Sequence, residues 1–211
     1  MKKVQLTTTI LASAVAAAAL GMSSVANAVP SFTASYDGNA CVAVTCAALG
    51  STMTGVSGGA VIAPATSVGG VAKRPGDDTG NGGAVVSYNV TSQNNNPTGA
   101  SSPITITGLN GAFDFYWGSI DSYNIVDFYL GTDFVTYNGT QAWAATGAGG
   151  SAPNYGTDGY FSFAGVFDKV VMSSSNGVAF EIARAVPEPG TLALLGLGLA
   201  GLGAARRRKA A

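Results

Sequence analysis

The chain has 211 residues, enough for one domain or two, and 30 of them are glycine, roughly twice the average share. Only 10% of the residues are charged, the formal net charge is −1, and there is no histidine. These values exclude a generally basic nucleic-acid binder. They also exclude Ser-His-Asp and Cys-His catalysis, zinc or haem held by histidine, and a histidine pH switch.

Residues 1–28 have the pattern of a secretory signal peptide. Two lysines near the start are followed by an apolar run over residues 10–20, and Ala26 and Ala28 form the small-x-small site that signal peptidase needs. An uncleaved membrane anchor is the alternative, but the run is short for a membrane span. We therefore expect signal peptidase to act on this chain and to leave Val29 as the first residue.

Residues 29–185 are predicted to form one β-rich domain, because short runs of strand formers alternate with glycine, asparagine, serine and proline. The predicted strands cover residues 86–90, 104–106, 113–117, 125–130, 134–137, 161–163, 166–172 and 178–182. This pattern favours an all-β fold, an antiparallel β-sandwich of jelly-roll type. A single closed barrel has the same periodicity and stays open. No amphipathic helix of useful length is apparent, and residues 50–83 and 91–103 are typical of loops.

The charge of this domain differs from that of the whole chain. It holds four basic and ten acidic side chains, which gives a net charge of −6. A surface of that sign repels nucleic acid and anionic membranes, so we expect no nucleic-acid partner. It is compatible with cation binding or simply with solubility.

Cys41 and Cys46 are the only cysteines, and both lie in the part predicted to be exported. In an oxidising compartment the pair predicts a disulfide that closes a small loop. Two free thiols and pairing between chains are the alternatives. A metal site is disfavoured, because two thiols without histidine make a poor ligand set.

Asp77, Asp78 and Asn81 provide oxygen atoms of the kind that calcium prefers. The segment lacks the acidic residue that completes an EF-hand loop, since Tyr88 falls at the twelfth place. An exposed turn is therefore the preferred interpretation. Calcium is the only cofactor for which the sequence offers a candidate site.

The segment after the predicted strand 113–117 combines an aromatic ring, a carboxylate and an amide. It contains Trp117, Asp121, Tyr123 and Asn124. Sugar sites use an apolar ring face together with fixed polar groups, so this turn is a candidate glycan-binding loop. The preferred interpretation is structural, with Trp117 in the core and Asp121 and Asn124 shaping the turn.

Glycosidic bonds are commonly cleaved by a pair of carboxyl groups. The domain has enough acidic residues for such a pair, but their positions in the sequence do not identify one. The available acids are Asp114, Asp121, Asp127, Asp133 and Asp168. Their spacing selects no pair, and serine nucleophiles have neither a histidine base nor a Ser-x-x-Lys motif. We therefore assign no catalytic residue and predict that the protein is not an enzyme.

The C-terminal segment, residues 186–211, has three parts in sequence. Val186, Pro187, Glu188 and Pro189 come first, an uncharged apolar run follows over residues 190–205, and Arg206, Arg207, Arg208 and Lys209 come last. As a helix the run reaches about 24 Å, close to the ~30 Å hydrocarbon core. It is predicted to span the inner membrane transiently, with the basic cluster on the cytoplasmic side.

This tripartite tail resembles the PEP-CTERM sorting signal of bacterial exosortase substrates. The resemblance implies that a membrane-embedded exosortase removes the tail and delivers the protein to the cell surface or extracellular matrix of a Gram-negative-type bacterium. The family is associated with bacteria that make exopolysaccharide. Residues 116–124 and 178–182 are also similar to segments in a subset of exosortase-dependent surface proteins, and neither segment carries an assigned activity.

The sequence thus predicts an exported surface or matrix protein with a structural or interaction role. Its processing partners are signal peptidase and exosortase, and exopolysaccharide is a candidate ligand. The alternatives are a carbohydrate-binding module that uses residues 117–124, with or without calcium, and a glycan-cleaving enzyme.

Overall fold

The structure is a computed structural model that describes residues 29–38, 40–77, 80, 82–91, 103–148, 157–175, 178–187, 195 and 197–200. The predicted signal peptide and most of the predicted membrane span at 190–205 therefore lie outside the described residues. Among the residues that are described, no helix is both long enough and apolar enough to span a membrane.

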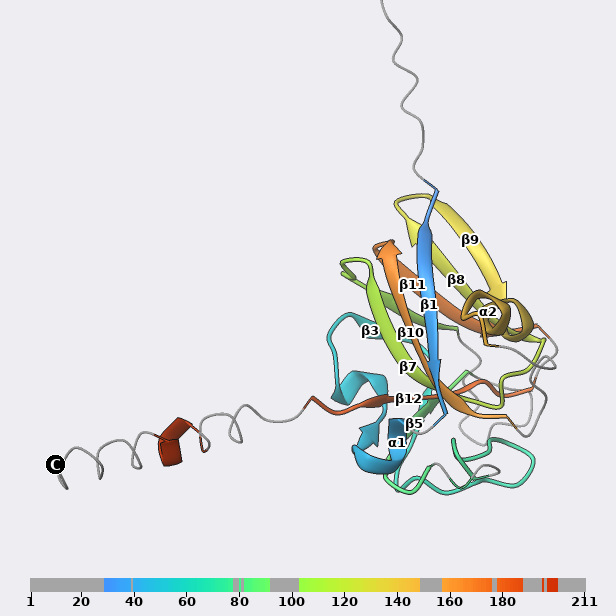
Figure 1. The fold of residues 1–211 in the computed structure, drawn as a ribbon. Helices are drawn as coiled ribbons and strands as arrows, with labels where there is room; N and C mark the ends of the chain where they lie inside the picture. Colours follow the sequence, from blue (N-terminus) through green and yellow to red (C-terminus); the bar gives the residue numbers. More distant parts are fainter. Residues whose placement is uncertain are drawn as a thin grey trace, which may run out of the picture.

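Two antiparallel sheets pack against each other, which confirms the predicted β-sandwich (Figure 1). The first has the order β1 (Ser31–Asp37), β10 (Gly159–Val166), β7 (Ala112–Gly118), β12 (Glu181–Ala185), β5 (Tyr88–Val90) and β4 (Ala60–Ile62), and β2 (Cys46–Ala47) also pairs with β12. The second has the order β3 (Val56–Ser57), β6 (Ile104–Thr107), β11 (Lys169–Ser174), β8 (Asn124–Leu130) and β9 (Asp133–Asn138). The connections include α1 (Ala40–Ala43), η1 (Leu49–Ser51) and α2 (Gly139–Ala145).

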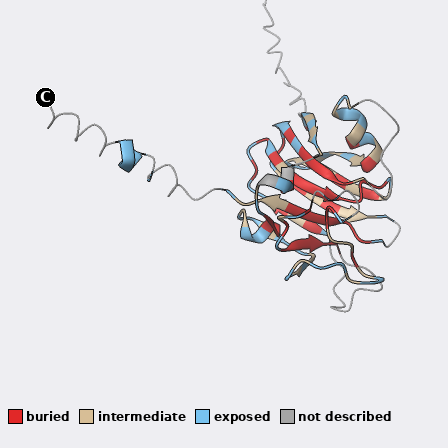
Figure 2. Cartoon of the chain, turned by 60° about the horizontal axis from the view of Figure 1, so that its bottom comes forward, coloured by how far each residue is buried: buried red, intermediate tan, exposed pale blue. Residues whose placement is uncertain are grey.

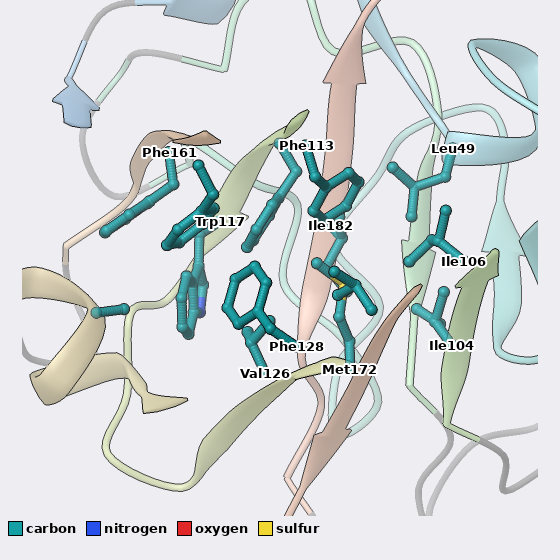
Figure 3. Packing of buried hydrophobic residues seen from close by; sticks show 14 of the residues in the cluster. Leu49, Ile104, Ile106, Phe113, Trp117, Val126, Phe128, Phe161, Met172 and Ile182 are labelled. Atoms are coloured by element: carbon teal, nitrogen blue, oxygen red, sulfur yellow. The ribbon is translucent and has the colours of Figure 1, made fainter. Parts of the chain in front are cut away.

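The main hydrophobic core fills the space between the two sheets. Phe113, Phe115 and Trp117 alternate along β7 and are buried, as the period-2 pattern predicts. Val126 and Phe128 of β8 face them from the second sheet (Figure 3). Because aromatic rings supply most of this contact, the core depends on a few large side chains.

A second hydrophobic cluster covers the opposite face of the seven-stranded sheet. It contains Tyr88, Tyr116 and Tyr160 together with Cys41 and Cys46. The segments that precede β5 lie over this face, so β7, β12 and β5 are buried on both sides (Figure 2). Four successive residues at the end of β7, numbers 115–118, are consequently buried.

Strand β1 is absent from the strands predicted by the sequence, although its pattern is regular. Phe32, Ala34 and Tyr36 point toward the core and alternate with polar residues. The Phe32 ring lies 4.2 Å from the Phe128 ring, between centroids, and so joins the two sheets at their edge.

The predicted single strand over residues 166–172 is wrong. Strand β10 ends at Val166 and β11 begins at Lys169, because the chain turns there to enter the other sheet. Phe167 is buried in the core at this turn, and the Asp168 N–H donates to the carbonyl of Tyr129 at 2.8 Å. The continuous alternation is a product of two strands that lie on different sheets.

The expectation that residues 50–83 form loops is partly wrong, and a short helix forms although no amphipathic helix of useful length is apparent in the sequence. Strands β3 and β4 lie in that range, and α2 follows β9 directly. A capping box starts α2, in which Asn138 accepts from the Gln141 N–H and the Gln141 side chain accepts from the Asn138 N–H. Trp143 of α2 then packs on Tyr36, so tertiary contacts stabilise a helix of only seven residues.

Candidate functional site

The residues predicted as a glycan-binding loop lie at and around the turn between β7 and β8, where Trp117, Asp121 and Asn124 are buried and Tyr123 is half-buried. Trp117 is 0% exposed and packs on Phe180, with ring centroids 4.8 Å apart. Asn124 is also fully buried and donates to the Ser119 carbonyl at 2.7 Å. Since a sugar ring cannot reach the buried Trp117 face, stacking on Trp117 is excluded in this structure, whereas a glycan contact of the half-buried Tyr123 stays a prediction.

Asp121 and Asn124 instead shape the turn, in agreement with the structural interpretation. The Asn124 and Gly139 N–H groups both donate to the Asp121 carbonyl, at 3.3 and 3.2 Å. The Tyr123 hydroxyl donates to the Asp121 carboxylate at 2.6 Å. The turn thereby connects β7, β8 and the start of α2.

Three buried acids gather beside this turn: Asp121, Asp158 and Glu181, which are 7%, 2% and 3% exposed. Asp158 accepts from the Ser119 and Gly76 N–H groups at 2.5 and 2.8 Å. Glu181, in β12, accepts from the Lys73 N–H at 2.9 Å. Asp158 and Glu181 therefore fasten the 72–77 segment to the ends of β7 and β12.

Electrostatics in this cluster follow from burial. Desolvation raises the pKa of Glu181 from 4.5 to about 8, and the nearby Asp158 and Asp121 carboxylates add to that rise. Burial also raises the pKa of Asp158 and of Asp121, and the charge of Lys73 opposes both of those shifts. Glu181 is thus largely neutral at pH 7 and can stay buried without a counter-ion.

The sequence did not point to Asp158 or Glu181. One signal was present, since Glu181 interrupts an apolar run between Phe180 and Ile182, where a charged residue needs a partner. The partners come from residues 73–76 and 158, which are distant in sequence. Of the acids that the sequence did single out, Asp121 belongs to this cluster.

Each of those acids serves a local contact. Asp114 forms an ion pair with Arg184 at 2.6 Å and accepts from the Tyr160 hydroxyl. Asp127 accepts from the Thr136 hydroxyl at 2.6 Å, and Asp168 accepts from the Gly131 N–H at 3.0 Å. Asp133 lies at the start of β9, opposite the last residue of β8.

The calcium candidates remain a prediction. Asp77 forms an ion pair with Arg74 at 3.7 Å and accepts from the Ser67 hydroxyl, while Asp78 and Asn81 lie outside the described residues. Among the residues that are described, no group of three or more histidine, cysteine or acidic side chains is placed to hold a metal ion. The Arg74 cation reduces the attraction of Asp77 for calcium.

Cys41 and Cys46 form a disulfide, which confirms the intramolecular pairing. The bridge closes the segment that contains Thr45 and leads into β2. Strand β2 pairs with the end of β12, where Ala185 lies opposite Cys46 and Arg184 opposite Ala47. The small loop is thereby attached to the last strand of the domain.

The outward face of the five-stranded sheet carries a pair of aromatic side chains. Tyr129 and Phe134 lie opposite each other on β8 and β9 and are stacked, with centroids 5.1 Å apart. The Lys169 ammonium lies 3.8 Å from the centre of the Tyr129 ring. Phe134 is 54% exposed, so its ring is accessible from solvent.

The chain leaves the domain at the end of β12. The Ala185 N–H donates to the Tyr160 hydroxyl at 3.2 Å, and the Val186 N–H donates to the Thr45 carbonyl at 2.8 Å. Pro187 is exposed. Glu188, Pro189 and the arginines at 206–208 lie outside the described residues, as do Ala26 and Ala28, whereas Val29 is described and exposed.

Residues 185–209, which begin at this exit, match the family model of the PEP-CTERM protein-sorting motif. The chain carries a PEP-CTERM sorting motif. Comparison with the curated proteins and with the solved structures gave no match. The PEP-CTERM motif implies an exported protein that is processed by exosortase and sorted to the cell surface.

Proposed function

We propose that the domain formed by residues 29–185 is a non-enzymatic module displayed at the cell surface or in the extracellular matrix. The observation that carries this proposal is the PEP-CTERM motif at 185–209, joined directly to the last strand of a folded domain. The buried acids support a structural role, because backbone N–H groups of the same domain bind them. In this function the folded domain is delivered to the surface, and the tail is the sorting signal that directs it there.

Deletion of residues 187–211 should abolish surface delivery. The domain keeps β12 and the disulfide, so it should still fold, but it loses the segment that exosortase processes. The measurement is fractionation of a host that carries exosortase, with intact mass of the surface fraction. The full-length chain is the control, and equal amounts of both proteins at the surface would contradict the proposal.

A second candidate function is saccharide binding at the outward face of the five-stranded sheet. Tyr129 and Phe134 offer a stacked, partly exposed apolar surface, and Lys169 fixes the Tyr129 ring. Asp127 and Thr136 form the neighbouring cross-strand pair on the same face. One residue pair, which faces the core, separates them from Tyr129 and Phe134. Rings beside hydroxyl and carboxylate groups suit a pyranose, which has an apolar face and a polar rim.

Charge argues for a neutral sugar chain. The domain carries a net charge of −6, which repels polyanions at long range. On this face the Lys169 ammonium already makes a cation–π contact with the Tyr129 ring. A neutral hexopyranose polymer meets neither obstacle, so the proposed ligand of this face is a neutral polysaccharide.

Phe134→Ala should weaken retention on a neutral polysaccharide roughly tenfold, because it removes the more exposed ring of the pair. The measurement is affinity electrophoresis in gels that contain hydroxyethylcellulose or galactomannan, with alginate as the acidic comparison. Val61→Ala is the matched control, since Val61 is 56% exposed on the other sheet. Migration unchanged by both neutral polymers, or equal retention of the two variants, would refute this function.

A further inference from the structure

The PEP-CTERM motif and the folded domain overlap. Ala185 is the last residue of β12 and also the first residue of the match to the motif. At the other end of the strand, Glu181 and Ile182 pair with both β7 and β5, so β12 is a central strand and not a frayed edge. The segment that exosortase must process therefore starts with no linker after the domain.

The backbone that immediately precedes Pro187 is already hydrogen-bonded within the domain. Ala185 lies opposite Cys46 and donates to the Tyr160 hydroxyl. Val186 donates to the Thr45 carbonyl at 2.8 Å. We call Thr45, Cys46 and Ala47 the β2 clamp, because these residues hold the exit of the chain against the domain.

The disulfide keeps the β2 clamp in place. Cys46 is bonded to Cys41, and both residues are fully buried under the outer face of the seven-stranded sheet. A second contact reinforces the same segment, since the Cys46 N–H donates to the Ala84 carbonyl at 3.0 Å and the Val86 N–H donates to the Cys46 carbonyl at 2.9 Å. Movement of the clamp away from β12 thus has to displace the buried Cys41–Cys46 bridge and break the hydrogen bonds of Cys46 to residues 84 and 86.

Enzymes that process a peptide segment commonly bind it in an extended form through its backbone N–H and C=O groups. The Ala185 N–H donates to the Tyr160 hydroxyl, and the Val186 N–H donates to the Thr45 carbonyl. In the folded state neither N–H group is available to an enzyme. An exosortase that contacts residues before Pro187 must wait for this end of β12 to detach. Both bonds lie in a half-buried strand end, and local opening there costs free energy because two backbone hydrogen bonds must break.

We propose that the β2 clamp restricts exosortase access to the PEP-CTERM motif, so that the tail is removed only when the end of β12 is released from β2. Processing is then fastest on chains whose last strand has not yet docked, and it slows once the domain has folded and Cys41–Cys46 has formed. The clamp residues act by positioning the substrate segment and take no part in the chemistry. This inference rests on exosortase processing of the chain and adds a control to it.

The test is an insertion of Gly-Ser-Gly-Ser between Val186 and Pro187 in the full-length chain. It leaves every bond of the domain intact and moves the motif four residues away from the clamp. Pulse-chase labelling in a host with exosortase, with precursor and mature forms separated by mass, should show tail removal about tenfold faster, the gain expected when opening of about two hydrogen bonds is no longer required. A rate equal to or below that of the natural chain would overturn the proposal.

Two further variants complete the test. The same four residues inserted between Gly69 and Gly70, in an exposed turn with open space around it, form the matched control and should leave the rate unchanged. Cys41→Ser combined with Cys46→Ser should accelerate tail removal without any insertion, and an unchanged rate would overturn the role of the disulfide. A natural chain that never loses its tail would instead refute exosortase processing itself, so the two failures are distinguishable.

Discussion

Trp117→Ala is expected to lower the free energy of unfolding of the domain by about 3–5 kcal/mol. Trp117 is the largest fully buried side chain, and its ring lies 5.4 Å from Phe115, 5.2 Å from Phe161 and 4.8 Å from Phe180, between centroids. Its removal leaves a cavity that strands of a rigid sheet cannot close. Figure 3 shows Trp117 and Phe161 among the buried side chains of this core.

The measurement is urea unfolding of the purified domain, residues 29–187, followed by circular dichroism. Trp117→Phe is the matched variant and should cost less than half as much, because it keeps an aromatic ring. It also removes an indole N–H that has no acceptor among the described residues. A loss below about 1 kcal/mol in the alanine variant would contradict the core position of Trp117.

Glu181→Gln is expected to make the domain more stable at alkaline pH, by an amount on the order of 3 kcal/mol at pH 9. The pKa of Glu181 is raised from 4.5 to about 8 in the folded state, mainly by burial. The folded domain therefore holds more protons than the unfolded chain between these values. Its stabilisation by the neutral carboxyl is complete below pH 4.5 and is lost as the pH rises through about 8.

Glutamine keeps the oxygen that accepts from the Lys73 N–H and removes the ionisation, so the stability of the variant should fall much less between pH 5 and pH 9. The measurement is the thermal unfolding midpoint of both proteins across that range. Asp133→Asn is the control, since it changes the charge equally at the β8–β9 hairpin, away from the cluster. Parallel pH profiles for natural and Glu181→Gln domains would contradict a buried neutral Glu181.

The contrast between Trp117 and Phe134 shows why the sequence could single out a buried ring as a candidate for stacking on a sugar. Both are aromatic residues in alternating strands that end near a turn. Only the sheet geometry decides that Trp117 faces the second sheet and Phe134 faces solvent. Alternation separates two faces of a strand, but it does not say which face a second layer will cover.

The acidic cluster escaped prediction for a related reason. Its members come from β12, from the 157–158 segment and from the 119–124 turn, and the 72–77 segment supplies N–H groups that bind two of them. The pKa of each acid then depends on burial by segments more than 20 residues away. No local spacing contains that information.

The sequence by itself determined the PEP-CTERM motif, the all-β class and the core positions of β7, because these depend on residue order and period-2 alternation. It favoured a sandwich over a barrel and an intramolecular Cys41–Cys46 bridge, and the structure confirmed both. The tertiary structure alone decided that the seven-stranded sheet is covered on both faces, that β1 and α2 exist, and that the motif starts where β2 holds β12. These features arise from pairing between segments far apart in the chain. Long-range pairing depends on which edges and faces remain open after all the other strands have packed.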